Sequence, residues 1–283
     1  MNAIANFVFA LSLMVLLSPI ARAQDAPPAG RPVLRGSVSH SDTLAPVDPY
    51  LREGAVFDAG RLPKPKSGNV WYRIPGWSAG HWKTETSTCY YARDLRTGLA
   101  DRQPTELVAR AEEDVGFQSD RLGDIWEYQH GSYIQRVDAG DHLVVQMVHL
   151  QEPLSVSEDK VVLRFQSINV SVDQFTRRIM ATKQVESIQT YTPYGVDTLR
   201  CVSSIKAFDS NGKPNWLQRN VSYKRRTASY KPWNSYKGRD LRKLFRDYLV
   251  AQGLEHLVPE HIEQAYGPRE LRARQGRLVL IPR

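Results

Sequence analysis

Residues 196–226 read VDTLRCVSSIKAFDSNGKPNWLQRNVSYKRR, with the turn signal Asp209-Ser210-Asn211-Gly212 between two runs rich in β-branched and aromatic residues. Asn-Gly between two such runs is among the strongest sequence signals for a β-hairpin, because both residues accept the positive φ angles of a tight turn. Alternate residues of a strand share one face. In the first run these are Leu199, Cys201, Ser203, Ile205 and Ala207. The stretch therefore predicts two paired antiparallel strands.

The same sequence pattern extends over residues 69–226, where runs of Val, Ile, Thr, Tyr and Phe are separated by turn signals. These signals lie at 139–141, 157–159, 192–195 and 209–212. The pattern predicts a mainly β fold of about eight antiparallel strands in a meander, either closed as a barrel or folded as a β-sandwich.

Helices are expected after the strands. In the stretch GRDLRKLFRDYLVAQG, the apolar residues recur at helical spacing and form one stripe. They are Leu241, Leu244, Phe245, Tyr248 and Leu249. Gly253 supplies a stop signal, and a shorter helix is expected to begin at Pro259 and to end before Gly267.

The N-terminus resembles an export signal. Residues 7–17 are apolar except for Ser12, and Ala21-Arg22-Ala23 gives a small-x-small cleavage pattern. The run is shorter than the ~20 apolar residues that span a bilayer. We therefore expect cleavage after residue 23 and a periplasmic or secreted product without a transmembrane segment.

Four segments follow from composition: a signal peptide (1–23), a Pro-rich arm (24–68), a β-rich domain with its trailing helix (69–253) and a basic tail (254–283). The arm shows no sustained periodicity and is expected to wrap the domain. Within it, VDPYLREGAVFDAG (47–60) is expected to make one helical turn or a docking segment.

Gly80-His81-Trp82 opens the first long β run, GHWKTETSTCYY (80–91). A Gly-x-Trp at this place, about eight antiparallel strands and a trailing helix resemble the lipocalins and the wider calycin group. The resemblance implies a barrel whose bottom is closed by Trp82. It also implies that a basic residue late in the last strand, Arg225 or Arg226, packs over the Trp82 ring.

Aromatic residues suggest where a ligand would bind. Six Trp and Tyr residues crowd into residues 71–91, which is typical of core packing and also of a pocket for an apolar or amphipathic small molecule. The expected ligand contacts are Trp77, Trp82, Tyr90 and Phe165. No cofactor is expected.

Positive charge is concentrated in one segment. The chain carries a formal charge of +8, and residues 223–246 hold nine Lys or Arg against one Asp. In an exported protein such a segment suits an anionic envelope component better than a nucleic acid. The residues expected on this surface are Arg225, Arg226, Lys231, Arg239, Arg242, Lys243 and Arg246.

Cys89 and Cys201 are the two cysteines of the chain. An even count in an oxidising compartment makes them candidates for one disulfide, with two buried free thiols as the alternative.

Catalysis has weaker support. Ser78 lies in GWSAG (76–80), which has the spacing of a nucleophile elbow, but β-prone residues follow where a helix is required. The histidines lack metal-ligand spacing. Four carboxylates lie within β runs, and we expect them on a solvated strand face: Glu85, Glu127, Glu152 and Glu186. The sequence therefore favours a non-enzymatic protein without a metal, with hydrolysis at Ser78 as a lesser alternative.

Overall fold

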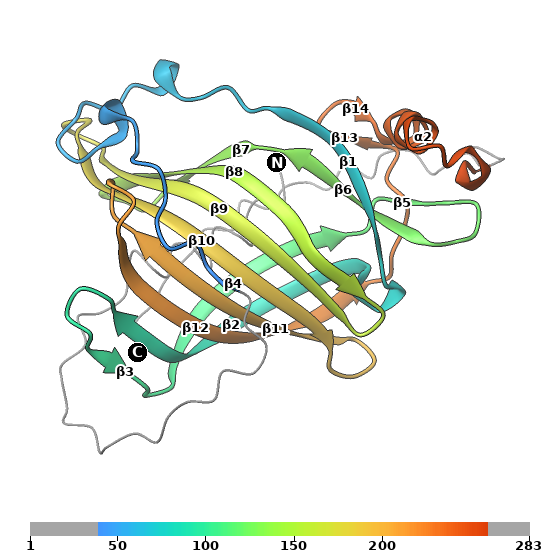
Figure 1. Cartoon of the computed structure of the whole chain (residues 1–283), viewed down its shortest axis with the longest axis horizontal. Coiled ribbons are helices and arrows are strands. Elements are labelled where there is room, and N and C mark those ends of the chain that lie inside the picture. Colours follow the sequence, from blue (N-terminus) through green and yellow to red (C-terminus); the bar gives the residue numbers. More distant parts are fainter. Residues whose placement is uncertain (1–38, 260–283) are drawn as a thin grey trace.

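The computed structural model describes residues 39–259, and strands dominate it (Figure 1). Its largest unit is a nine-stranded sheet in which all pairs are antiparallel. The strands are, in chain order, β2 (Gly80–Asp94), β3 (Ala100–Asp101), β4 (Thr105–Val115), β7 (Tyr133–Asp138), β8 (His142–Ser157), β9 (Lys160–Asp173), β10 (Ile179–Pro193), β11 (Thr198–Phe208) and β12 (Pro214–Ala228). The predicted mainly β, antiparallel fold is confirmed.

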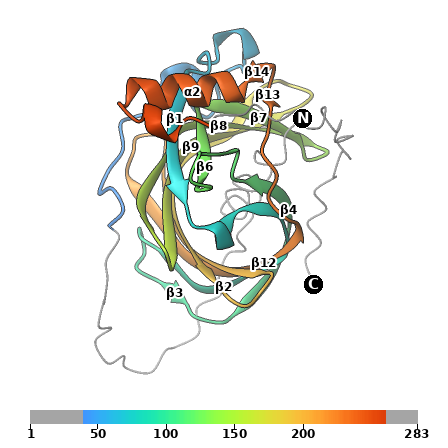
Figure 2. The ribbon, with the colours of Figure 1, turned by 90° about the vertical axis from the view of Figure 1, so that its right-hand side faces the viewer.

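The strand order is that of a meander whose first long strand pairs with its last. From β7 to β12 each strand pairs with the next in sequence, and β12 then pairs with β2, which also pairs with β3 and β4. The sheet is strongly curved, and we refer to this curved sheet as the trough (Figure 2). Its edges at β4 and β7 do not pair with each other, so no sheet of the described residues is closed as a barrel.

The chain also forms a separate small sheet. It contains β5 (Gln118–Ser119) and β6 (Ile125–Gly131), which connect β4 to β7 along the chain, and β1 (Ser67–Ile74) from earlier in the chain. The strand order is β1-β6-β5. The segment that connects β4 to β7 therefore forms hydrogen bonds with β1 and does not extend the large sheet. This pairing explains why the ring of paired strands is interrupted between β4 and β7.

The helix α2 (Leu241–Ala251) covers the small sheet. Asp240 caps its N-terminus by accepting hydrogen bonds from the backbone of Arg242 and Lys243. Leu241, Phe245 and Leu249 are buried, so the predicted apolar stripe is confirmed. They pack with Trp71, Phe117, Trp126 and Tyr128.

Short elements complete the described chain. They are the 3₁₀ helices η1 (Pro49–Leu51), η2 (Ala59–Arg61), η3 (Gly76–Ser78) and η4 (Glu255–Leu257), and the hairpin of β13 (Ser235–Tyr236) and β14 (Arg239–Asp240). Within residues 39–259, no helix is long and apolar enough to cross a membrane. The expected signal peptide, second C-terminal helix and basic tail lie outside the described residues, apart from the tail's first six.

Strand alternation gives the trough two different faces. One face carries Phe165, Gln189 and Ser203, which belong to neighbouring strands. Trp77 of η3 packs against this face beside Tyr191 and Cys201, so we call it the inner face. The opposite, outer face carries the alternate residues of the same strands.

The N-terminal arm crosses the outer face of the trough (Figure 1). Its side chains Val47, Leu51 and Phe57 are buried. They pack against an apolar patch of the outer face formed by Val145, Met147, Val170, Val172 and Ile179. Burying each arm side chain contributes roughly 1.5–3 kcal/mol, so residues 47–60 are the docking segment that the sequence predicts.

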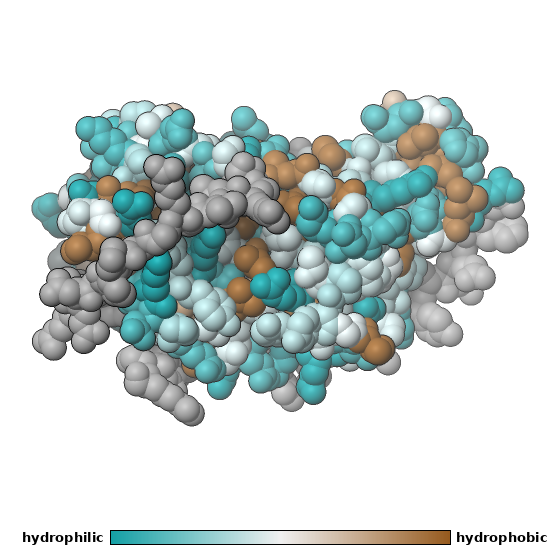
Figure 3. Space-filling model, turned by 60° about the horizontal axis from the view of Figure 1, so that its bottom comes forward, coloured by the Kyte–Doolittle hydropathy of each residue, from teal (hydrophilic) through white to brown (hydrophobic). Residues whose placement is uncertain are grey.

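The exposed surface on the bottom of the molecule carries both hydrophobic and hydrophilic residues. Seen from the bottom of Figure 1, hydrophobic residues lie in small groups between hydrophilic ones (Figure 3). Such scattered apolar groups are normal for a folded chain and do not form one broad docking surface in this view.

Of the two alternatives for Cys89 and Cys201, one disulfide or two free thiols, the structure has two free thiols. Cys89 lies on β2 and Cys201 on β11, with β12 between them. Two strand spacings amount to about 9–10 Å, whereas a disulfide joins Cα atoms usually about 4.4–6.8 Å apart. Burial raises the pKa of the Cys201 thiol, which favours an inert thiol.

Candidate functional site

The inner face of the trough is unusually polar for a buried surface. Hydroxyl and amide side chains from β2 and β7–β12 point to this face and are buried. They are Thr84, Ser87, Gln135, Gln146, Ser167, Asn169, Ser171, Ser187, Gln189, Ser203, Gln218, Asn220 and Ser222. Because burying a polar group is costly unless it is hydrogen-bonded, such a lining needs polar partners.

Some of these side chains form hydrogen bonds with one another. Gln146 donates to Ser167 Oγ over 3.4 Å, and Ser167 donates to Asn169 over 3.2 Å. Gln218 donates to Asn220 over 2.8 Å. These amides and hydroxyls therefore form chains of hydrogen bonds that run along and across the strands.

Three buried polar atoms of the lining have no hydrogen-bond partner among residues 39–259: Ser87 Oγ, Ser222 Oγ and Asn169 Nδ2. Ser87 and Ser222 are direct cross-strand partners on β2 and β12. An unmet buried donor or acceptor costs about 1–3 kcal/mol. A site that keeps several of them is suited to a polar group that arrives from outside the chain.

A buried ion pair lies beside these hydroxyls. Lys224 on β12 donates to Glu113 on β4, and its ammonium lies 4.5 Å from the centroid of the Tyr191 ring. Lys224 is fully buried and Glu113 is 8% exposed. A buried ion pair contributes little net stability against its desolvation cost, so its presence marks the inner face as more than a packing surface.

Glu127 brings a further titratable group close to this pair. It lies on β6 opposite Tyr72 of β1, and its carboxylate accepts a 2.6 Å hydrogen bond from the Gly116 amide. Burial, with Glu113 and Asp114 nearby, raises its pKa to about 8. Glu127 is therefore largely protonated at neutral pH, in contrast to the expected solvated carboxylate.

Contacts around Trp82 connect β2, β12 and η3. The Arg226 guanidinium carbon lies 4.6 Å from the centroid of the Trp82 ring. Arg226 also donates to the carbonyls of Ala79 and Trp77, over 2.8 Å each, so it holds η3 in place. A Cβ on Gly80 would lie 2.8 Å from the Ala228 carbonyl, which explains the glycine of the Gly-x-Trp. The prediction that Arg225 or Arg226 packs over Trp82 is confirmed for Arg226.

The predicted ligand contacts lie in different environments. Phe165 is buried on the inner face with Leu163, Val148 and Tyr133. Trp82 is buried beneath Arg226, and Trp77 is partly buried, with its indole nitrogen donating to the Glu158 carbonyl over 2.5 Å. Tyr90 is 47% exposed where β2 bulges. Phe165, Trp77 and Trp82 thus lie on or against the inner face, whereas Tyr90 is exposed.

The predicted basic surface is divided by the fold. Arg226 points to the trough end, and Arg239 donates to Tyr128 and Gly68 beneath α2. The remaining residues are exposed or partly exposed at separate places: Arg225, Lys231, Arg242, Lys243 and Arg246. The structure therefore does not gather all seven on one surface.

Ser78 has no catalytic geometry. It is buried, and its hydroxyl donates to the Pro75 carbonyl of the same turn over 2.8 Å. Within the described residues, no three His, Cys, Asp or Glu side chains form a group that could hold a metal ion.

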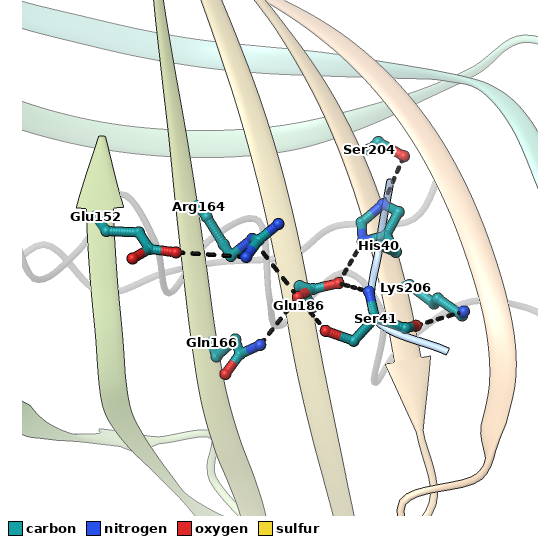
Figure 4. Close-up of polar contacts among 8 residues, drawn as sticks. All are labelled: His40, Ser41, Glu152, Arg164, Gln166, Glu186, Ser204 and Lys206. Atoms are coloured by element: carbon teal, nitrogen blue, oxygen red, sulfur yellow. Dashed lines mark hydrogen bonds and ion pairs between the residues drawn. The ribbon is translucent and has the colours of Figure 1, made fainter. Parts of the chain in front are cut away.

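A second polar centre lies on the outer face, where the arm crosses β10 and β11 (Figure 4). His40 Nδ1 lies 2.9 Å from Glu186 Oε2, and His40 Nε2 lies 2.8 Å from Ser204 Oγ. The backbone amide and the hydroxyl of Ser41 also donate to Glu186, over 2.7 and 2.9 Å. Lys206 donates to the Ser41 carbonyl over 2.7 Å.

Glu186 is fully buried at this centre. Burial alone would raise its pKa, but hydrogen bonds from His40, Gln166 and Ser41 outweigh burial and hold the pKa at about 2. The expected solvated carboxylate is therefore wrong for Glu186 because the arm covers this part of the outer face. His40 and Ser204 were not singled out from the sequence, since nothing in the arm indicates where it docks.

Comparisons with known proteins give no relative for this chain: no family model, curated protein or solved structure matches it.

Proposed function

We propose that this chain is an exported binding protein that holds an amphipathic small molecule against the inner face of the trough. The proposal is carried by three buried atoms that lack a partner within the described part of the chain, Ser87 Oγ, Ser222 Oγ and Asn169 Nδ2, in a lining of hydroxyls and amides. A ligand's polar atoms would complete these hydrogen bonds. Export rests on the sequence pattern of residues 1–23.

The apolar part of the ligand has its own surface. Phe165, Leu163, Val148 and Tyr133 form a cluster on the inner face. In the β9–β10 ladder, Leu163 pairs with Gln189 and Phe165 with Ser187, so the cluster directly borders the polar lining. This juxtaposition favours an amphipathic ligand over a purely hydrophobic one.

The architecture that we propose for this site is a calycin-like barrel opened along one side. Three observations support it: the meander order, the pairing of the first long strand β2 with the last strand β12, and the Arg226–Trp82 contact with η3. It differs from a closed barrel because β4 and β7 do not pair with each other.

Docking on an anionic envelope component is the alternative. Arg225 and Lys231 are exposed, as are Lys243 and Arg246 of α2. Because the remaining predicted members contact the protein interior or are partly buried, this alternative has less support than binding in the trough.

Native mass spectrometry of protein purified from the periplasm tests the proposal. We expect extra mass that leaves on denaturation. A bare mass, together with no binding of the amphipathic probe 11-(dansylamino)undecanoic acid, would contradict it.

A matched pair of serine variants locates the probe. Ser222→Ala removes an unpartnered buried hydroxyl, so the ligand-free protein should be as stable as the wild type or more so. It should bind the probe about 2- to 12-fold more weakly, the effect of one hydrogen bond of about 0.5–1.5 kcal/mol. Ser155→Ala, at an exposed position of β8, should change neither property. If Ser222→Ala destabilises the protein and leaves the probe affinity unchanged, the lining binds water only.

A further inference from the structure

The outer-face centre has the arrangement of a serine nucleophile with its base. Ser204 on β11 and Glu186 on β10 share the outer face, because Ser204 pairs with Ile188 and Glu186 pairs with Lys206. His40 of the arm bridges them, with 2.9 Å from Nδ1 to Glu186 and 2.8 Å from Nε2 to Ser204 Oγ. Figure 4 shows the three side chains in line.

The contacts of Glu186 fix the roles of the two imidazole nitrogens. An ionised carboxylate only accepts hydrogen bonds, so His40 Nδ1 must carry the hydrogen that it shares with Glu186. In neutral His40, Nε2 is then the acceptor for the Ser204 hydroxyl. This is the arrangement in which a histidine removes a proton from a serine while a carboxylate orients the ring.

Docking of the arm alone does not account for this geometry. Ser41 already fastens the arm through its two hydrogen bonds to Glu186 and through its carbonyl, which accepts from Lys206. His40 is 9% exposed in its side chain, and Ser204 is partly buried. Arg219, the cross-strand partner of Ser204 on β12, is exposed and offers guanidinium donors for negative charge that develops next to Ser204.

We propose that Ser204 is the nucleophile of an acyl-transfer site that cleaves carboxylic esters, with His40 as general base and Glu186 as the positioning residue. Ser204 Oγ bonds to the carbonyl carbon of the ester while its proton passes to His40 Nε2. The bond from that carbon to the alcohol oxygen breaks, and the alcohol leaves with the proton from His40. Water then attacks the acyl-serine, gives its proton to His40, and releases the acid as Ser204 regains its proton.

A fluorophosphonate probe tests the nucleophile directly, because a bond from serine Oγ to phosphorus forms as fluoride leaves. We expect one probe per chain, on the peptide that contains Ser204. Ser204→Ala should not be labelled. Ser155→Ala, which alters an exposed serine of β8 outside both candidate sites, should be labelled like the wild type. An unlabelled wild type, or equal labelling of Ser204→Ala, would overturn the proposal.

Turnover and the base are tested with p-nitrophenyl acetate. Hydrolysis should fall by about 100-fold or more in Ser204→Ala and in His40→Gln, with no change in Ser155→Ala. Equal rates in all four proteins would overturn the assignment.

A cysteine variant covers the case in which Ser204→Ala does not fold. The thiol of Ser204→Cys, placed beside His40, should react with iodoacetamide with a pH midpoint below the ordinary value of about 8.5. Adding His40→Gln should return the midpoint to that value. An ordinary midpoint in Ser204→Cys itself would count against His40 as the base.

Discussion

Arg226 and Trp82 face each other across β12 and β2, with the guanidinium carbon 4.6 Å from the centroid of the indole ring. The same guanidinium donates to the carbonyls of Trp77 and Ala79. A single side chain therefore joins the last long strand, the first long strand and the 3₁₀ helix η3 at one end of the trough.

Arg226→Ala should lower the free energy of unfolding by about 2–4 kcal/mol, because it removes two charge-assisted hydrogen bonds and uncovers Trp82. Arg225→Ala is the matched control, since Arg225 is exposed on the outer face, and it should change stability by no more than about 0.5 kcal/mol. Urea unfolding followed by Trp fluorescence measures both. Equal losses in the two variants would show that the Arg226 contacts do not hold this end together.

Lys224→Met should destabilise the protein by about 3–5 kcal/mol, because it leaves Glu113 buried without its partner. The double variant Lys224→Met/Glu113→Leu should recover much of this loss, since no charge is then left uncompensated. The same unfolding measurement on both single variants and the double variant completes the cycle. A double variant as unstable as Lys224→Met would contradict the ion-pair interpretation.

Glu127 should make the protein less stable as the pH rises. Its pKa is about 8 in the folded chain, against an ordinary value of 4.5. Below the ordinary value both states are protonated and the group does not oppose folding. As the pH rises toward about 8, only the unfolded chain releases the proton, so stability falls, and above that pH the loss is complete.

Glu127→Gln should flatten this pH dependence and raise stability at pH 8, because the neutral amide still offers an oxygen to the Gly116 amide. Glu106→Gln, at an exposed position of β4, serves as the control and should leave the slope unchanged. Thermal unfolding between pH 5 and 8 distinguishes them. An unchanged slope in Glu127→Gln would place the ionisation elsewhere.

Gly212→Ala should loosen the arm. Gly212 has a φ of +80°, and a Cβ there would lie 1.8 Å from the Leu44 carbonyl oxygen. Gly140→Ala meets the same kind of φ, +95°, but no atom within 4 Å, and should cost only the left-handed strain of about 1–2 kcal/mol. Limited proteolysis should therefore cleave residues 44–57 faster in Gly212→Ala alone. Equal cleavage in both variants would mean that the close approach does not secure the arm.

Local patterns in the sequence predict much of the fold. Asn211-Gly212 marks the β11–β12 hairpin, and the spacing of Leu241, Phe245 and Leu249 identifies the buried stripe of α2. The break between β4 and β7 leaves no comparable signal, because it depends on the return of β1, from earlier in the chain, to pair with β6.

The candidate sites depend on contacts that the alternation of side chains along a strand does not predict. Alternation places Ser204 on the face opposite Ser203, but it does not show that Glu186 shares that face or that an aperiodic arm brings His40 onto it. The sequence does not predict the inner lining for another reason. Its Gln, Asn and Ser residues are buried, whereas a pattern of alternating hydrophobic residues predicts that polar residues face solvent. The sequence leaves a disulfide and two free thiols as alternatives for Cys89 and Cys201, because the number of cysteines does not show that β12 lies between them.

The unpaired edges of β4 and β7 have a mechanical consequence. In a closed barrel, strand number and stagger fix the circumference through a continuous ring of hydrogen bonds. Here the ring is interrupted, so strand-to-strand hydrogen bonds do not fix the distance between the edges of β4 and β7. At this interruption the small sheet contacts β8, so side-chain packing replaces the missing hydrogen-bonded closure.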